Sequence, residues 1–84
     1  RILYTKKFLK SLKQLPEETQ NEATDKTEIF QTNIFDKRLK THKLHGKMQD
    51  FWSFSVNYKY RVLFGFLDKN TVAFDDIGGH EKYS

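Results

Sequence analysis

The chain of 84 residues has no cysteine, one proline, four glycines and only short apolar runs. The absence of cysteine excludes disulfide bonds, iron–sulfur clusters, thiolate zinc sites and a thiol nucleophile. No run approaches the roughly 20 apolar residues that span a bilayer, and no signal-peptide pattern opens the sequence. We therefore expect a soluble, cytoplasmic protein without membrane contact. A single domain should occupy residues 1–84, because so short a chain has no room for a second core.

The sequence is rich in aromatic residues, and its charged residues are unevenly distributed. Eight Phe, four Tyr and one Trp supply large rings for a small core. The net charge is +4, and residues 37–47 carry five Lys or Arg and two His with no acid. Such a stretch is either a solvated surface or a patch that contacts phosphates, and the sequence leaves both open.

The spacing of apolar residues predicts two helices near the start of the chain. Phe8, Leu12 and Leu15 recur at i, i+4 and i+7, which predicts a helix over about 5–14 with Thr5 as its N-cap. Pro16 ends that helix and suits the first turn of a second one, which should run to about residue 34. The two helices should form a hairpin.

From residue 51 onward the pattern alternates and predicts strands. The expected strands cover about 51–56, 60–67 and 71–77, and segment 39–48 adds a fourth strand or a structured loop. The short connections require antiparallel pairing. The predicted fold class is therefore α+β, with an N-terminal helical hairpin packed on a twisted antiparallel sheet of about four strands.

Metal and paired-carboxylate chemistry find little support in the sequence. His42 and His45 form an H-x-x-H pair, but the two side chains of such a pair on a strand point to opposite faces. Asp75 and Asp76 are adjacent in a predicted strand and should also face apart. We expect neither a metal nor another cofactor.

Arg61 and His80 are the residues most suggestive of chemistry. Arg61 interrupts an apolar strand with a planar cation that can hold a phosphate through two hydrogen bonds, although a solvated sheet face would also explain it. His80 follows Gly78 and Gly79 beyond the last strand, where an imidazole could donate a proton to a leaving oxygen. Tyr83 could stack on a base.

The sequence contains four short motifs in order, His42–Gly46, Trp52–Val56, Tyr60–Phe64 and Ile77–Tyr83. Taken together, these motifs resemble the RelE/ParE toxin superfamily, and more narrowly its RelE/StbE and YafQ-like mRNA interferase branch. The likeness covers essentially the whole chain and is strongest over 42–83. It implies a microbial-RNase-like α+β fold and the toxin of a type II toxin–antitoxin system.

The activity that the resemblance implies is endoribonuclease cleavage of mRNA, usually on the ribosome, by attack of a ribose 2'-hydroxyl without a metal. His80 matches the C-terminal histidine and inherits the general-acid role, Arg61 matches a strand arginine that acts on the phosphate, and His42 matches an active-site histidine. Tyr83 resembles a terminal aromatic that orients the substrate. Lys43, Lys47 and His45 are further expected substrate-binding residues, from the basic stretch. The implied partners are a cognate antitoxin, mRNA and the ribosome.

The resemblance leaves some questions open. The turn at 57–59 lacks the histidine and aspartate that YafQ-like members carry, so the general base is either His42 or a group of ribosomal RNA. Proteins of the ParE type share the fold and inhibit DNA gyrase without catalytic residues, so fold alone does not decide function. The alternatives are a gyrase inhibitor and an inactive relative that only binds an antitoxin.

Overall fold

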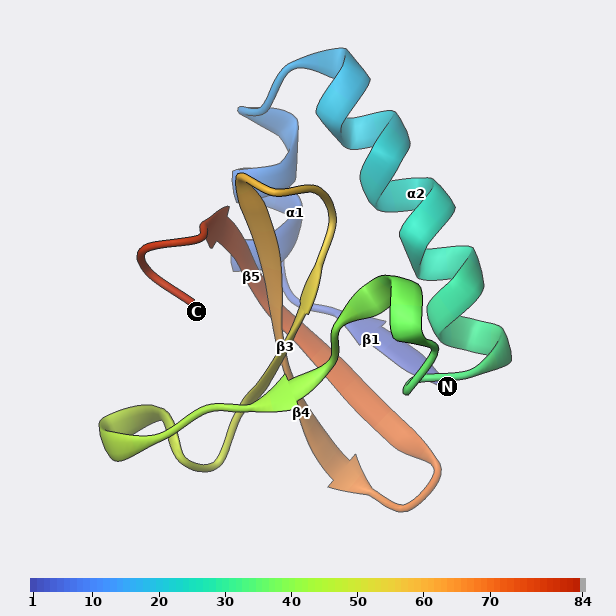
Figure 1. Cartoon of the computed structure of the whole chain (residues 1–84), viewed down its shortest axis with the longest axis vertical. Helices are drawn as coiled ribbons and strands as arrows, with labels where there is room; N and C mark the ends of the chain where they lie inside the picture. Colours follow the sequence, from blue (N-terminus) through green and yellow to red (C-terminus); the bar gives the residue numbers. More distant parts are fainter. Residues whose placement is uncertain (84) are drawn as a thin grey trace.

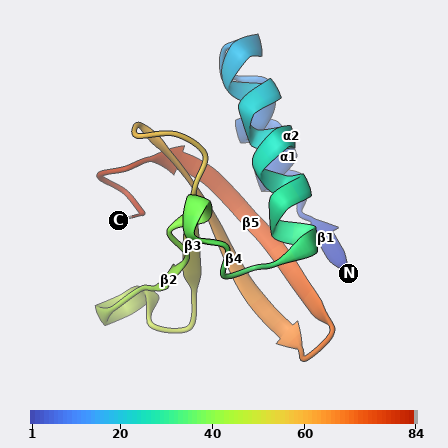
Figure 2. The same ribbon diagram turned by 45° about the vertical axis from the view of Figure 1, so that its right-hand side comes forward.

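The computed structural model describes residues 1–83, and residue 84 lies outside the described part. Two helices lie on one side of a five-stranded sheet (Figures 1 and 2). In chain order the elements are β1 (Ile2–Tyr4), α1 (Lys6–Lys13), α2 (Glu17–Thr32), the 3-10 helix η1 (Lys37–Leu39), β2 (His42–Lys43), the 3-10 helix η2 (Gly46–Met48), β3 (Trp52–Ser55), β4 (Tyr60–Asp68) and β5 (Thr71–Gly79).

The sheet differs from the prediction in strand number and in one direction. Its order is β1-β5-β4-β3-β2, and β1 runs parallel to β5 while all other neighbours are antiparallel. The expected antiparallel sheet of about four strands is thus a mixed sheet of five. The extra strand depends on pairing across most of the chain: the Val72 nitrogen donates to the Arg1 carbonyl at 2.9 Å. Local alternation cannot reveal such a long-range pairing.

The two predicted helices are confirmed, with ends shifted by a residue or two. Thr5 caps α1 as expected, because its hydroxyl oxygen accepts a hydrogen bond from the Phe8 nitrogen at 3.1 Å. Glu17 and Glu18 stand in the first turn of α2, where the positive end of the helix dipole favours acids. Neither helix within residues 1–83 is long and apolar enough to cross a membrane.

The main core lies between the helices and one face of the sheet. The Phe30 ring of α2 has its centroid 5.1 Å from that of Phe54, 5.0 Å from Phe64 and 5.2 Å from Phe74. All four rings are buried. Truncating such a ring to alanine typically costs about 3–5 kcal/mol, so Phe30 fixes α2 to the centre of the sheet.

The opposite face of the sheet, here named the distal face, carries the residues of alternate phase. They are His42 of β2, Ser53 and Ser55 of β3, Arg61 and Leu63 of β4, and Asp76 and Gly78 of β5. A second, smaller core covers part of this face. In it Leu44, Leu63 and Tyr83 are buried, with Met48 and Phe51 packed against them. The C-terminal segment is therefore held against the distal face.

The last strand is two residues longer than predicted. Gly78 pairs with Arg61 and Gly79 with Tyr60, so these glycines continue β5 beyond Ile77. A Cβ atom on residue 78 would lie 3.1 Å from Cε2 of Tyr83, whereas one on residue 79 would meet nothing within 4 Å. Glycine is thus needed at position 78 for the close approach of an aromatic ring.

Candidate active site

Arg61 and His80 lie near each other at one end of the β4–β5 pair. The Arg61 Cα is paired with that of Gly78, and the His80 nitrogen donates to the Lys59 carbonyl at 2.7 Å, which extends the ladder beyond β5. Diagonal neighbours across an antiparallel pair have Cα atoms about 7–8 Å apart, which fits residues 61 and 80. His80 is exposed and Arg61 half-buried. The backbone pairing therefore places both residues at the same end of the β4–β5 pair.

The Arg61 guanidinium is positioned by the turn that precedes β4. Its Nη1 donates to the carbonyl oxygens of Asn57 at 2.7 Å and Tyr60 at 3.3 Å. A guanidinium has five N–H donors, so the remaining ones stay available for a ligand. Because its partners are backbone carbonyls and not carboxylates, the positive charge is oriented without being neutralised.

Asp76 fastens the segment that carries His80. Its carboxylate accepts hydrogen bonds from the Ser11 hydroxyl at 2.6 Å and the Tyr83 hydroxyl at 2.7 Å. The ammonium groups of Lys7 and Lys82 lie 3.8 and 3.7 Å from its Oδ2. Burial by itself raises the pKa of Asp76, but the hydrogen bonds from Ser11 and Tyr83 outweigh it, so the pKa is lowered. The residue is a buried anion that joins α1, β5 and the C-terminal segment.

In the structure Tyr83 has a structural role and not the expected role of stacking on a base. The residue is only 3% exposed, and the Ser53 hydroxyl donates to its carbonyl at 3.1 Å. Burial and the hydrogen bond to Asp76 raise the pKa of its phenol, which keeps the hydroxyl a donor. A buried ring cannot receive a base, so in this structure Tyr83 holds residues 80–82 in place. The sequence analysis missed this network, although an aspartate within an apolar strand was a signal that buried partners were needed.

His42 has a defined ring orientation but stands apart from the other two residues. Its Nδ1 lies 2.9 Å from the Lys40 carbonyl, and since a carbonyl only accepts, Nδ1 carries the proton and leaves Nε2 free. His42 pairs with Ser53, two strands from β4 and one row away from the row of Arg61. The usual strand spacing and rise put their Cα atoms roughly 12 Å apart. The expected convergence of three side chains is therefore seen at the backbone only for Arg61 and His80.

The basic residues chosen from the sequence are spread over different surfaces. Lys43 pairs with Trp52, so alternation puts it on the face opposite to that of His42. His45 precedes η2 and Lys47 lies within it, in the loop after β2. All three are exposed. None of the three lies on a strand next to that of Arg61, because β2 pairs with β3 and not with β4.

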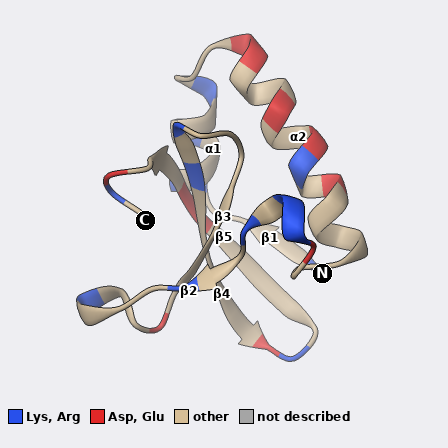
Figure 3. Cartoon of the chain, in the orientation of Figure 1, with Lys and Arg blue, Asp and Glu red and all other residues tan. Residues whose placement is uncertain are grey.

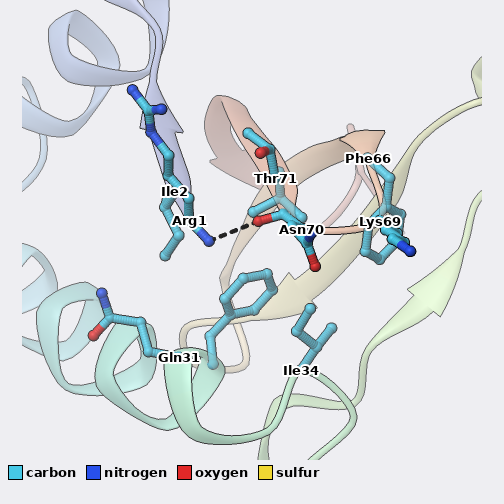
Figure 4. A pocket seen from close by; sticks show the side chains of 10 residues that line it. Arg1, Ile2, Gln31, Ile34, Phe66, Lys69, Asn70 and Thr71 are labelled. Atoms are coloured by element: carbon cyan, nitrogen blue, oxygen red, sulfur yellow. Dashed lines mark hydrogen bonds between the residues drawn. The ribbon is translucent and has the colours of Figure 1, made fainter.

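Two further hollows of the described chain lie away from this site. One, of about 280 Å³, lies where Arg1 and Ile2 of the first strand meet Gln31 and Ile34 of α2 and the β4–β5 turn (Figure 4). The Arg1 backbone nitrogen donates to the Asn70 carbonyl there at 2.9 Å. The other is an apolar groove of about 340 Å³ between α1 and α2, lined by Tyr4, Leu9 and Leu12 among others. No group of three His, Asp or Glu within residues 1–83 is arranged to hold a metal ion.

The fold of two helices on a mixed five-stranded sheet matches the fold of the YafQ and YoeB/ParE toxins. No family model and no curated protein sequence matches the chain. Among solved structures, YafQ from E. coli strain BL21(DE3) matches with a TM-score of 0.78 and 17% identity, over 98% of this chain and 94% of YafQ.

Two other structures support the same fold. The YoeB/ParE toxin from Agrobacterium tumefaciens matches with a TM-score of 0.78 and 13% identity, over 95% of this chain and 98% of the toxin. A chain of the E. coli DinJ–YafQ toxin–antitoxin complex matches with a TM-score of 0.75 and 19% identity, over 98% and 93%. Agreement over nearly the full length of each chain, at such low identity, establishes the fold.

Proposed function

We propose that this protein is the toxin of a bacterial toxin–antitoxin system and an endoribonuclease that cleaves mRNA on the ribosome. The observation that carries the proposal is the proximity of Arg61 and His80 at the end of β4 and β5. Cleavage of RNA requires stabilisation of charge on a phosphate and protonation of a leaving oxygen, and these two residue types supply both.

In the proposed reaction the ribose 2'-hydroxyl loses its proton to a base and its oxygen attacks the adjacent phosphorus. The bond between phosphorus and the 5'-oxygen breaks, and His80 donates a proton to that oxygen. The products are a 2',3'-cyclic phosphate and a 5'-hydroxyl. Arg61 stabilises the negative charge that builds up on the phosphate oxygens. The reaction needs no oxidant, reductant or further reactant.

His42 is the protein's candidate for the general base. Its free Nε2 is the nitrogen that would accept the proton, since Nδ1 is held by the Lys40 carbonyl. The separation from Arg61 requires the substrate to lie across the distal face between β2 and β4. If His42 is not the base, a group of ribosomal RNA takes that role.

The proposed protein partner is a cognate antitoxin. The fold match to a chain of the DinJ–YafQ toxin–antitoxin complex supports this, as does the net charge of +4, which suits an acidic segment. The groove between α1 and α2 exposes Leu9 and Tyr4, at 42% and 45%, and offers an apolar surface to such a segment. The test is a search for a small acidic reading frame that overlaps this gene; co-expression of its product with this chain should yield a stable complex and restore growth.

The decisive experiment is brief induction in bacteria followed by primer extension on an abundant mRNA. The wild type should produce new 5' ends that disappear when translation is blocked. His80→Ala should lower cleavage by about 10²–10⁴-fold, and Arg61→Ala by about 10²–10³-fold. Arg1→Ala removes the same charge at the far end of the sheet and should cleave normally. Intact transcripts with induced DNA damage signalling, unchanged in His80→Ala, would instead identify a gyrase inhibitor.

A further inference from the structure

A hollow of about 230 Å³ lies beside Arg61 and is lined mainly by basic and polar side chains. Its lining residues are Lys26, Arg38, Lys40, Ser55, Asn57, Tyr58 and Arg61. They come from five parts of the chain: α2, the segment of η1, the end of β3, the turn before β4 and the start of β4. The basic parts of α2 and η1 lie side by side in Figure 3. The fold thus assembles four cations that the sequence disperses.

The hollow exists because β3 has a free edge at its end. β2 pairs only with Trp52 and Ser53, so the backbone at Ser55 and Val56 has no neighbouring strand on that side. Lys26 extends from α2, and its ammonium donates to the Val56 carbonyl at 2.9 Å. This hydrogen bond fixes a basic side chain beside the hollow.

The positive charge of the hollow is largely uncompensated. No carboxylate lines it, although Asp36 holds Arg38 through two bonds of 2.9 Å behind it, and Glu22 accepts from the Asn57 side chain at 2.9 Å. The remaining cations are Lys26, Lys40 and Arg61. Two of these are anchored by backbone carbonyls, which leave their charges intact.

Donors toward the hollow are also available. Within residues 1–83 no hydrogen bond engages the Lys40 ammonium or the Ser55 hydroxyl, and Ser55 is only 7% exposed. Lys40 has a left-handed backbone conformation with φ 52°, which is uncommon for a residue other than glycine. Lys40 is the C-cap of η1, and glycine would adopt this conformation more easily, so a change to glycine should not disturb the backbone there.

We propose that this hollow binds a backbone phosphate of single-stranded RNA, next to the phosphate that is cleaved. The inference rests on the proposed function for the identity of the ligand. Arg61 stands between His80 on the β5 side and the hollow on the β3 side, so a strand crossing the distal face would meet both. Ammonium, guanidinium and hydroxyl donors around a space of this size match the several oxygens of one phosphate better than a carboxylate.

The test is equilibrium binding of a short 2'-O-methyl RNA, which cannot be cleaved, to the full chain carrying His80→Ala. Fluorescence anisotropy is recorded over a series of salt concentrations. Adding Lys40→Gly removes the charge at a position whose φ suits glycine, so folding is preserved. Affinity should fall roughly three- to tenfold, and the slope of log K against log salt should decrease by about 0.7 for one lost phosphate contact.

Two more variants test whether RNA binding depends on the hollow itself or only on the overall positive charge. Lys37→Ala makes the same change of charge at the start of the 3-10 helix that Lys40 caps, but Lys37 does not line the hollow, so binding and slope should stay unchanged. Ser55→Ala should weaken binding several-fold without altering the slope. Inorganic phosphate alone should shift the amide NMR signals of residues 40, 55 and 61.

The outcomes distinguish this inference from the proposed function. If RNA binds equally with Lys40→Gly and Lys37→Ala, the hollow is not a phosphate site, whatever the cleavage experiment shows. If a glutamate-rich peptide needs Lys40 while RNA and phosphate do not, the hollow receives an acidic protein segment and the inference is wrong. Binding of RNA that depends on Lys40, in a protein that cleaves no transcript, would support the hollow and reject the nuclease.

Discussion

The Tyr83 hydroxyl donates a hydrogen bond of 2.7 Å to Oδ2 of Asp76, seven residues earlier and near the end of β5. The contact is buried and closes a loop over the turn that presents His80. A residue at the end of the described chain therefore determines where the candidate general acid stands. We name this contact between Asp76 and Tyr83 the latch.

Removal of the Tyr83 hydroxyl should loosen the latch without emptying the small core. Tyr83→Phe keeps the ring against Leu44 and Leu63 but leaves a buried carboxylate with one donor fewer. Hydrogen bonds to charged groups contribute about 1.5–3 kcal/mol, so urea denaturation should show a loss of that order. Tyr58→Phe, at a side chain 90% exposed, should change stability by less than about 0.5 kcal/mol. Equal effects of the two changes would contradict a latch.

The Asp76 carboxylate should make the folded state sensitive to acid. Its pKa is lowered in the folded protein, so its stabilisation is complete above the unfolded pKa and is lost as pH falls through the folded value. Unfolding free energies at pH 7 and pH 3 should differ more for the wild type than for Asp76→Asn. Asp50→Asn, at an exposed position, serves as the control and should follow the wild type. Parallel pH curves for wild type and Asp76→Asn would show that the latch is not ionised.

The two glycines at the end of β5 should respond oppositely to alanine. In Gly78→Ala the new methyl group would lie 3.1 Å from the Tyr83 ring, so the ring must move and stability should fall by about 1 kcal/mol. In Gly79→Ala the methyl group enters open space, and the less flexible unfolded chain should stabilise the protein by about 0.4–1 kcal/mol. The melting temperatures of the two variants, compared with that of the wild type, measure these opposite effects. A lower value for Gly79→Ala than for Gly78→Ala would refute this assignment.

The role proposed for His42 can be separated from its structural contact. In His42→Asn the amide nitrogen can replace Nδ1 as donor to the Lys40 carbonyl, while the free Nε2 is lost. The variant should fold with nearly wild-type stability and cleave about 10²–10⁴-fold more slowly, as expected for loss of a general base. Primer extension and a melting curve on the same protein measure both properties. Normal cleavage would leave the base to a group outside the protein.

The positions of the site residues in the fold show which predictions from the sequence were informative about the site. Alternation along β4 placed Arg61 opposite the core, and the glycines before His80 indicated an exposed position. Charge alone favoured Lys43 and Lys47 of the basic stretch, whereas Arg38 and Lys40 of that stretch line the hollow beside Arg61. A run of basic residues predicts a positively charged surface but not which side of the molecule that surface faces. The side depends on where the chain turns at η1 and β2.

The sequence by itself determined the two helices, the strands β3, β4 and β5 and the aromatic core, because each follows from the spacing of apolar residues within a short window. Only the tertiary structure decided the parallel pairing of β1 with β5, the latch between Asp76 and Tyr83, and the gathering of Lys26, Lys40 and Arg61. The strand pairing and the gathering of cations join residues that are distant in the chain, and the latch forms because the C-terminal segment folds back onto the sheet. The partners in these contacts are set by how the helices pack on the sheet and not by any local pattern.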